Sequence, residues 1–329
     1  MIVLYKSLIL NNLKTNEREM EIMLEKEQIV KTAIMTDSNS GITQTEGEQL
    51  GITVVPMPFF INQELYYEDI TLSQEKFYKF LENEDVEVST SMPTLGDIQD
   101  IWDRLLKEYE EVVYIPMSSG LSGSYEAASF LAEDSYSGRV EVVNNQRISV
   151  TLRQSVLDAK QMAEHGWSAK RIREYLEKTK FDSSIYITLD TLKYLKKGGR
   201  VTPAAASIAT VLNIKPVLQI QGEKLDSYAK TRSFNKAKDI MLSAVEYDIR
   251  ERFGGDKQDI WIAVAYSGDR TAADEWKKEL QEIYPYNEIV VNPLSLSVSC
   301  HIGSGALAIL CSKKIPDDLF DEDLKLLDM

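Results

Sequence analysis

The chain has 329 residues, of which 43% are hydrophobic and 27% are charged. This composition is typical of a folded protein of about two domains, and it excludes a disordered chain or a coiled coil. The 37 basic and 52 acidic residues leave a formal net charge of −15. Such a surface repels phosphate backbones and anionic headgroups, so we expect neither nucleic acid nor a membrane surface as a partner. No run approaches the ~20 apolar residues of a membrane-spanning helix.

Few cysteine and histidine residues are available for metal or disulfide chemistry. Cys300 and Cys311 cannot form a disulfide framework, and the sequence spacing of His165 and His301 does not match a zinc site. We therefore expect no bound metal and a cytoplasmic location, where thiols stay reduced. The apolar start of the chain is short and lacks a small-residue cleavage site, which argues against a signal peptide.

The sequence predicts an N-terminal extension over residues 1–30, either a short amphipathic helix or a disordered arm. Residues 31–178 then alternate short apolar strands with helical patterns, which predicts a doubly wound, Rossmann-like α/β domain with a parallel sheet covered on both faces. The expected strands are 32–36, 52–56, 112–115 and 140–143, and the expected helices are 95–109, 125–133 and 149–165.

Residues 179–329 have a different rhythm, which predicts a second, α+β domain with a mixed or antiparallel sheet. Gln221-Gly222-Glu223 between two apolar runs indicates a hairpin. A charged amphipathic helix over 168–180 can bridge the two domains. The expected strands are 185–188, 216–220, 224–228, 260–266 and 289–291, with helices near 233–252 and 271–283.

Loops rich in hydroxyl groups are candidates for a binding site. We expect the loops 36–40, 89–94 and 118–124 to meet at the carboxyl edge of the parallel sheet, where such folds bind ligands. Each loop alone is typical of a turn or a helix cap, but three together favour a site for an anion held by hydroxyl and backbone N–H groups. A fourth candidate is His301, which lies among the glycines of segment 299–305.

Cations gather locally in this acidic chain, in segment 192–200 and in Lys230-Thr231-Arg232. Lysines before a glycine are ordinary at the end of a helix. The alternative is a site for a phosphate or for an acidic partner surface. The sequence leaves both interpretations open.

Some chemistry is excluded by missing motifs, and some remains as an alternative. The chain has no Gly-x-x-x-x-Gly-Lys-Ser/Thr loop and no Gly-x-Gly-x-x-Gly after its first strand. Gly120-Leu121-Ser122-Gly123-Ser124 comes close to a nucleophile elbow, so a Ser-dependent esterase built from Ser122, His301 and Asp37 is an alternative. A regulatory module for a small anion is another.

Six motifs in order resemble the DegV family, the fatty-acid-binding proteins that serve as acyl-carrying subunits of bacterial fatty acid kinase. The resemblance covers about residues 32–312. The motifs are Thr36-Asp37-Ser38, Thr90-Ser91-Met92-Pro93, the segments 118–125 and 192–200, Asn213-Ile214-Lys215-Pro216, and His301-Ile302-Gly303-Ser304-Gly305.

The resemblance implies two α/β domains with one long-chain fatty acid in a buried tunnel between them. A separate ATP-dependent kinase subunit would phosphorylate the carboxylate, and the acyl phosphate would feed phospholipid synthesis. The chain itself would then be a lipid carrier and no enzyme, with no cofactor and no integral membrane association.

The family's functional residues map onto positions of this chain through the same motifs. The implied carboxylate ligands are Thr90, Ser122 and His301. The residues implied to lie behind them are Asp37, Ser38, Ser91, Ser119 and Gly303, and those implied to work with the kinase are Arg200 and Arg232.

The chain departs from the family pattern at several positions. Met92 replaces the Gln of Thr-Ser-Gln-Pro, Ile302 and Ser304 replace the Thr and Pro of His-Thr-Gly-Pro-Gly, and Asn144-Asn145 replaces an Asp-Ser pair. These differences concern the headgroup and the choice of acyl chain, and they leave the class unchanged.

Overall fold

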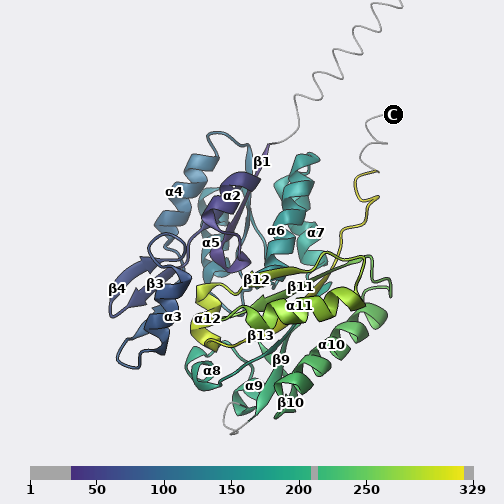
Figure 1. Cartoon of the computed structure of the whole chain (residues 1–329). Coiled ribbons are helices and arrows are strands. Elements are labelled where there is room, and N and C mark those ends of the chain that lie inside the picture. The colour runs from purple at the N-terminus through teal and green to yellow at the C-terminus, as the bar shows by residue number, and fades with distance from the viewer. Residues whose placement is uncertain (1–30, 209–213, 322–329) are drawn as a thin grey trace, which may run out of the picture.

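The structure is a computed structural model that describes residues 31–208 and 214–321, so the predicted extension 1–30 lies outside the described residues. The described chain forms a four-stranded sheet, a six-stranded sheet and a smaller three-stranded sheet (Figure 1). The two larger sheets confirm the predicted fold class, a parallel α/β part followed by a part with a mixed sheet.

The first sheet is parallel throughout, with the strand order β2-β1-β6-β7. Alternate residues of β1 are buried on opposite faces, with Met35 in the cluster around Trp102 and Ile34 in the cluster around Val156. Burial on both faces explains why these strands are continuous apolar runs. The strands are β1 (Thr32–Asp37), β2 (Ile52–Val55), β6 (Glu111–Ile115) and β7 (Val140–Val142).

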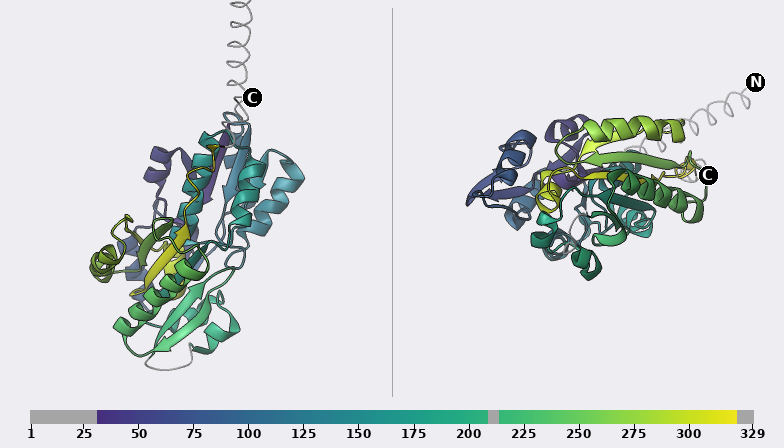
Figure 2. Two further views of the ribbon diagram at one scale, coloured as in Figure 1. Left: turned by 90° about the vertical axis from the view of Figure 1, so that its right-hand side faces the viewer. Right: turned by 60° about the horizontal axis from the view of Figure 1, so that its bottom comes forward.

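Helices cover both faces of this sheet, as the doubly wound prediction requires (Figure 2). Trp102 and Ala128 anchor one helical layer, and Val156 and Ile172 anchor the other. The first layer contains α4 (Leu95–Leu105) and α5 (Ser124–Ser135), and the second contains α2 (Gln44–Leu50), α6 (Ser149–Glu164) and α7 (Ala169–Lys178).

The predicted helix near 168–180 is α7, which packs mainly against α6, β6 and β7 of the first half of the chain. Its apolar face carries Ile172 and Leu176, which need the first sheet for burial. The bridging element is α6, which contacts β1 on one side and β8, β11 and β13 on the other. Because one hydrophobic cluster continues through both halves, the domain boundary at residue 178 remains a prediction.

The second sheet is mixed, in the order β10-β9-β8-β13-β11-β12, with only β11 and β12 parallel among its neighbours. The predicted hairpin is present, although its second strand begins at Asp226. The sequence analysis missed β13, which lies buried in the middle of the sheet. The strands are β8 (Ser183–Thr188), β9 (Lys215–Ile220), β10 (Asp226–Thr231), β11 (Ile260–Tyr266), β12 (Val290–Pro293) and β13 (Leu307–Lys313).

Two long helices, α10 (Phe234–Glu251) and α11 (Thr271–Ile283), cover one face of the second sheet (Figure 1). Tyr186 of β8 faces this layer, whereas its neighbours Ile185 and Ile187 face the first half of the chain. The alternation therefore leaves an apolar face of the second sheet directed towards the first half of the chain. The shorter helices are α8 (Lys193–Gly198), α9 (Pro203–Ile208), α12 (Leu296–Ile302) and the 3-10 turn η1 (Ser38–Ser40).

The three-stranded antiparallel sheet was not predicted. It has the order β4-β3-β5 and stands at one side of the molecule with α3 (Figure 1). Thr90 ends β5, so loop 89–94 follows a strand of this small sheet and not one of the parallel sheet. Residues Asn62 and Gln63 make the tight turn between β3 and β4 with positive φ angles. The elements are β3 (Pro58–Ile61), β4 (Glu64–Tyr67), β5 (Val88–Thr90) and α3 (Gln74–Glu82).

Gly120 marks a close approach between the two halves of the chain. A Cβ atom at this position would lie 2.5 Å from the carbonyl oxygen of Glu223, in the turn between β9 and β10. The Ser118 hydroxyl donates to the same carbonyl oxygen over 2.9 Å. A glycine here lets the β6–α5 loop rest directly on the backbone of the hairpin turn.

Replacement of Gly120 by alanine should therefore destabilise the protein. We expect Gly120→Ala to lower the free energy of unfolding by ~1–3 kcal/mol, because the methyl group meets backbone that must shift. Gly96→Ala in helix α4 is the matched control. A Cβ atom there would be 3.8 Å from its nearest neighbour, so this variant should leave the free energy of unfolding unchanged or slightly raised. Urea denaturation of both variants tests this, and equal effects would contradict the close approach.

Candidate functional site: an apolar cavity with a polar end

A cavity of about 240 Å³ lies between the loops at the carboxyl end of the parallel sheet and the inward face of the second sheet. Ile185 and Ile187 of β8 form one wall, and Met57 and Met117, which follow β2 and β6, form another. The remaining apolar lining consists of Met92, Leu121, Ile148, Leu195, Val201, Ile220, Leu225, Leu294, Val298, Ile302 and Ala308.

Polar groups gather at one end of this cavity. The Thr90 hydroxyl and the His301 Nε2 atom lie 3.1 Å apart, and both line the cavity together with Ser122. The Ser122 and Ser124 hydroxyl groups are 2.8 Å apart at the start of α5. Thr90 comes from the end of β5, Ser122 from the loop before α5, and His301 from the last turn of α12. Three elements that are distant in sequence thus bring neutral donors to one place.

The His301 imidazole is neutral at physiological pH. Burial and, to a smaller extent, the nearby Arg200 charge lower the pKa of His301 to about 4. A neutral imidazole has one N–H donor and one acceptor nitrogen. His301 can therefore donate to an anion, as the hydroxyl groups beside it can, without adding a positive charge to the site.

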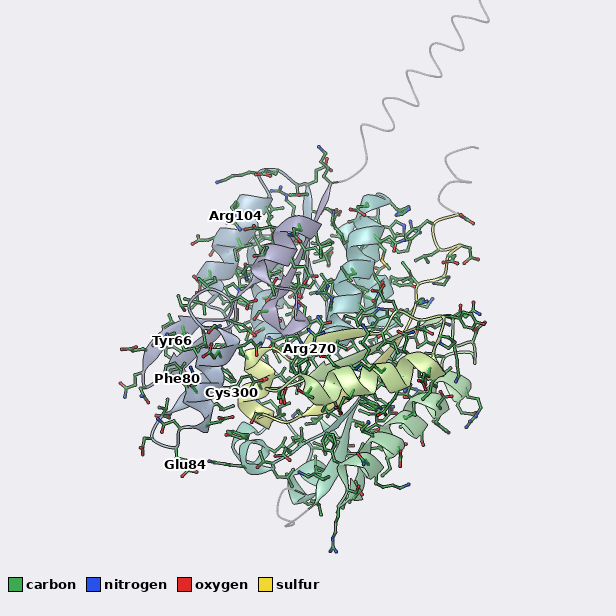
Figure 3. All side chains as sticks on the ribbon, in the orientation of Figure 1. Tyr66, Phe80, Glu84, Arg104, Arg270 and Cys300 are labelled. Atoms are coloured by element: carbon green, nitrogen blue, oxygen red, sulfur yellow. The ribbon has the colours of Figure 1, made fainter. Side chains whose placement is uncertain are left out.

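A second, more polar pocket of about 480 Å³ lies outside this polar end. Thr90, Arg200 and His301 line both spaces, so they stand between the apolar cavity and the outer pocket. The ion pair of Lys193 and Glu84 spans 2.7 Å at the outer pocket. In Figure 3, Cys300 marks helix α12 and Glu84 marks the loop after α3, and both line this pocket. Burial raises the pKa of Cys300 to about 11, so its thiol stays protonated.

Asp37 and Ser38 support the cavity from behind. The Met117 N–H donates to the Asp37 carboxylate over 2.9 Å, and the Met57 N–H donates to the Ser38 hydroxyl over 3.1 Å. Neither Asp37 nor Ser38 lines the cavity itself. Both fix the backbone of methionines that do, which is an indirect role. Burial raises the pKa of Asp37 to about 6.

Glu68 extends this support to helix α12. Its carboxyl group accepts a hydrogen bond from the Ser38 hydroxyl over 2.6 Å and another from the Leu296 N–H at the start of α12. The side chain is buried, and burial raises the pKa of Glu68 to about 8. Because α12 carries His301, Glu68 is a positioning residue for the polar end of the cavity.

The structure brings together some of the residues singled out by sequence and separates others. Thr90, Ser91, Ser122, Arg200 and His301 all line the cavity. The residues that do not line it are Asp37, Ser38, Ser119, Gly303 and Arg232, and Arg232 is exposed just beyond β10.

Gly303 has a packing role in this structure. It has a φ of +82°, and a Cβ atom there would overlap the ring of Tyr194. Only glycine combines that backbone conformation with such close contact. Gly303 therefore lets α8 pack against the end of α12, next to His301.

The residues of the esterase alternative are not connected as a catalytic triad. His301 Nε2 is beside Thr90, Ser122 is beside Ser124, and the Asp37 carboxylate accepts from the N–H groups of Met117 and Asn39. A triad needs the histidine between the serine and the acid. This arrangement offers hydrogen bonds to a bound anion and no activated nucleophile.

Sequence reasoning missed Glu68, Ser149 and Ser297. Four residues that line the cavity have the spacing of one helix face, namely positions 294, 297, 298 and 301. This spacing could have identified Ser297 from the sequence. Glu68 had no such signal, since an acidic residue in a turn is ordinarily exposed.

The described parts of the chain offer neither a metal cluster nor a membrane-spanning helix. Residues 31–208 and 214–321 contain no group of three or more His, Cys, Asp or Glu side chains that could hold a metal ion. Over the same ranges, no helix has the length and apolar character to cross a bilayer.

The fold and the site together define an α/β protein with an apolar cavity that ends in hydroxyl and imidazole donors, with Arg200 beside them. The family model for DegV proteins, described as an uncharacterised protein family, matches residues 31–314. The chain therefore belongs to the DegV family, as the motifs indicated.

Relatives and solved structures agree with this assignment. A DegV domain-containing protein of Streptococcus pneumoniae is 30% identical over 86% of this chain and 98% of its own length. A DegV family protein from Thermus thermophilus, described as binding fatty acid, has a TM-score of 0.78 at 28% identity, over 86% of this chain and all of that one. DegV of Bacillus subtilis, described as a fatty acid binding protein, has a TM-score of 0.77 at 27% identity, over 87% and 100%.

The buried Glu68 carboxyl predicts a specific pH dependence of stability. Between its ordinary pKa of 4.5 and its folded pKa of about 8, the folded protein keeps a proton that the unfolded chain releases. The free energy of unfolding must then fall as the pH rises through this range. Glu68→Gln cannot titrate, so the stability of the parent relative to this variant should decrease from pH ~5 to pH ~8.

Urea denaturation at several pH values measures this difference. The exposed Glu275→Gln serves as the control, and its stability relative to the parent should change little over the same range. A constant difference between the parent and Glu68→Gln would contradict a buried, protonated Glu68.

Proposed function

We propose that this protein binds one long-chain fatty acid in the apolar cavity, with the carboxylate held by Thr90, Ser122 and His301. The observation that carries the proposal is the combination of an apolar cavity with a neutral imidazole and hydroxyl groups at one end. An acyl chain has this same polarity, a long apolar body with one polar end.

Two solved relatives support the choice of ligand. The Thermus thermophilus and Bacillus subtilis proteins, both described as fatty-acid-binding, match the fold of almost the whole described chain. Burial of the chain dominates the expected affinity, since ~15 methylene groups contribute ~0.8 kcal/mol each. The hydroxyl and imidazole groups then orient the carboxylate.

The proposal extends to a phosphoryl-transfer partner. The sequence has no P-loop of its own, and the DegV resemblance implies a separate ATP-dependent kinase subunit in the cytoplasm. A carboxylate held by neutral donors keeps more of its nucleophilicity than one held by an arginine fork, which forms stronger charge-assisted hydrogen bonds. The outer pocket next to Thr90 and His301 offers a route by which a partner would reach the carboxylate.

Substitution of the proposed ligands should weaken fatty acid binding. Each of Ser122→Ala and His301→Ala removes a hydrogen bond to a charged oxygen, worth ~1.5–3 kcal/mol, so oleate or palmitate affinity should fall roughly tenfold or more. Ser119→Ala is the matched control, because Ser119 is in the same loop but does not line the cavity. Isothermal titration calorimetry measures the affinities.

Parent-like affinity in both variants would remove these residues from the ligand set. Rapid labelling of Ser122 by a fluorophosphonate probe, with turnover of a chromogenic ester, would favour the esterase alternative over the carrier.

Arg200 and Arg232 should matter chiefly for the partner. We expect Arg200→Ala and Arg232→Ala still to bind fatty acid and to lose acyl-phosphate formation with the cognate kinase and ATP. Affinity should equal that of the parent in Arg232→Ala, and it should fall modestly in Arg200→Ala because Arg200 lines the polar end of the cavity. Raised salt should mimic part of the loss, because exposed charges are screened beyond a Debye length of ~8–10 Å. Arg270→Ala is the control, since Arg270 is an exposed arginine just before α11 that pairs with Asp274. Normal phosphorylation by both variants would contradict the assignment.

A further inference from the structure

Two buried serines face the apolar cavity without a hydrogen-bond partner. Ser149 and Ser297 are each 4% exposed, and both line the cavity. Within residues 31–208 and 214–321, neither hydroxyl group hydrogen-bonds to another residue. Neither oxygen belongs to the fully buried polar atoms that lack a partner, so both hydroxyl groups border the cavity, where water or a ligand can hydrogen-bond to them.

The serines on either side of Ser297, Ser295 just before α12 and Ser299 within it, both have hydrogen-bond partners. The Ser295 hydroxyl donates to the Asn39 side chain over 3.0 Å, and the Ser299 hydroxyl accepts from the Tyr78 hydroxyl over 3.0 Å. Ser297, between them, is directed into the cavity instead.

Ser297 lies on the inner side of the proposed carboxylate site. It precedes His301 by four residues on the same helix, which is about one turn, or ~6 Å along the axis. His301 lines both the cavity and the outer pocket, whereas Ser297 lines the cavity alone. The hydroxyl group of Ser297 therefore meets the acyl chain and not its carboxylate.

Ser149 reaches the same cavity from the opposite half of the chain. It is the first residue of α6 and has a φ of +56°, a conformation that is unfavourable for a residue with a side chain. A purely apolar cavity would need neither hydroxyl group. A plain methylene chain would strip water from both hydroxyl groups and give no hydrogen bond in return.

We propose that Ser149 and Ser297 make the cavity selective for a fatty acid that carries a hydroxyl group on its chain. A hydroxyl on the ligand can both donate and accept, so it satisfies a serine that a methylene group would leave unpaired. Sites that hydrogen-bond a ligand hydroxyl discriminate strongly against the analogue that lacks it. This inference rests on the proposed function, because it specifies the fatty acid that the cavity takes.

The test compares stearate with a set of hydroxystearates that differ in the position of the hydroxyl group. The parent protein should bind the best hydroxystearate about tenfold more tightly than stearate, the effect of one net hydrogen bond of ~1.4 kcal/mol. Because Ser297 is one turn from His301, the best isomer should carry its hydroxyl nearer the carboxyl end than mid-chain.

Variants separate a selective role from a structural one. Ser297→Ala and Ser149→Ala should each reduce the preference towards unity, by weakening hydroxystearate binding and strengthening stearate binding. A merely structural serine would weaken both ligands together. The control is Ser243→Ala, on the exposed side of α10, where the hydroxyl donates to a backbone carbonyl.

The outcomes distinguish this inference from the proposed function. Two results would overturn the inference and leave fatty acid binding intact. One is an affinity for stearate that equals or exceeds the affinity for every hydroxystearate. The other is a preference for a hydroxystearate that is unchanged in both Ser297→Ala and Ser149→Ala. If neither stearate nor any hydroxystearate binds, the proposed function fails, and the selectivity fails with it.

Discussion

The candidate site depends on one buried carboxyl group, that of Glu68. It joins three segments that are far apart in the sequence: the end of β4, the turn after β1 through Ser38, and the start of α12 through the Leu296 N–H. Burial makes the charged form of this carboxyl costly, which is why its pKa is raised to about 8. Together with the hydrogen bond from the Ser295 hydroxyl to the Asn39 side chain, this junction fixes the start of α12, and with it His301, against the parallel sheet.

The cavity follows from how the two larger sheets share helix α6. One side of α6 packs on β1 and the other faces β8, β11 and β13. Where the helix begins, at Ser149, the inward side chains Ile185 and Ile187 of β8 line the cavity opposite loop residues. Apolar walls and small loop residues meet there, and the polar groups of Thr90 and His301 close the end that faces the outer pocket. The arrangement suits a molecule that is apolar over most of its length.

Local patterns in the sequence were sufficient for the parallel sheet and for much of the polar end. Strands such as 112–115 are continuous apolar runs between helices, and that alternation has few other solutions. The hydroxyl-rich loop 118–124 and His301 stood out because several such polar segments were expected at one edge of the sheet, although each alone is typical of a turn or a helix cap. Thr90 was named as a candidate and lies at the cavity, but its strand β5 was not predicted, since β5 has only three residues and its partner β3 is distant in sequence.

The rest could not be read locally, because it depends on contacts between remote segments. β13 is recognisable as a central strand only once its neighbours β8 and β11 are known. Ser149 and Ser297 look like ordinary helix-start and helix residues until the cavity between them is seen. Glu68 is an acidic residue beside a turn, and only the tertiary fold shows that it is buried.

Native mass spectrometry of the purified protein, with lipid extraction of the same sample, tests the central claim most directly. The account predicts one long-chain acyl ligand per folded chain, which is released on denaturation and recovered as a free fatty acid. A chain that carries no acyl ligand, and that takes up none when oleate, palmitate or a hydroxystearate is added, would contradict it.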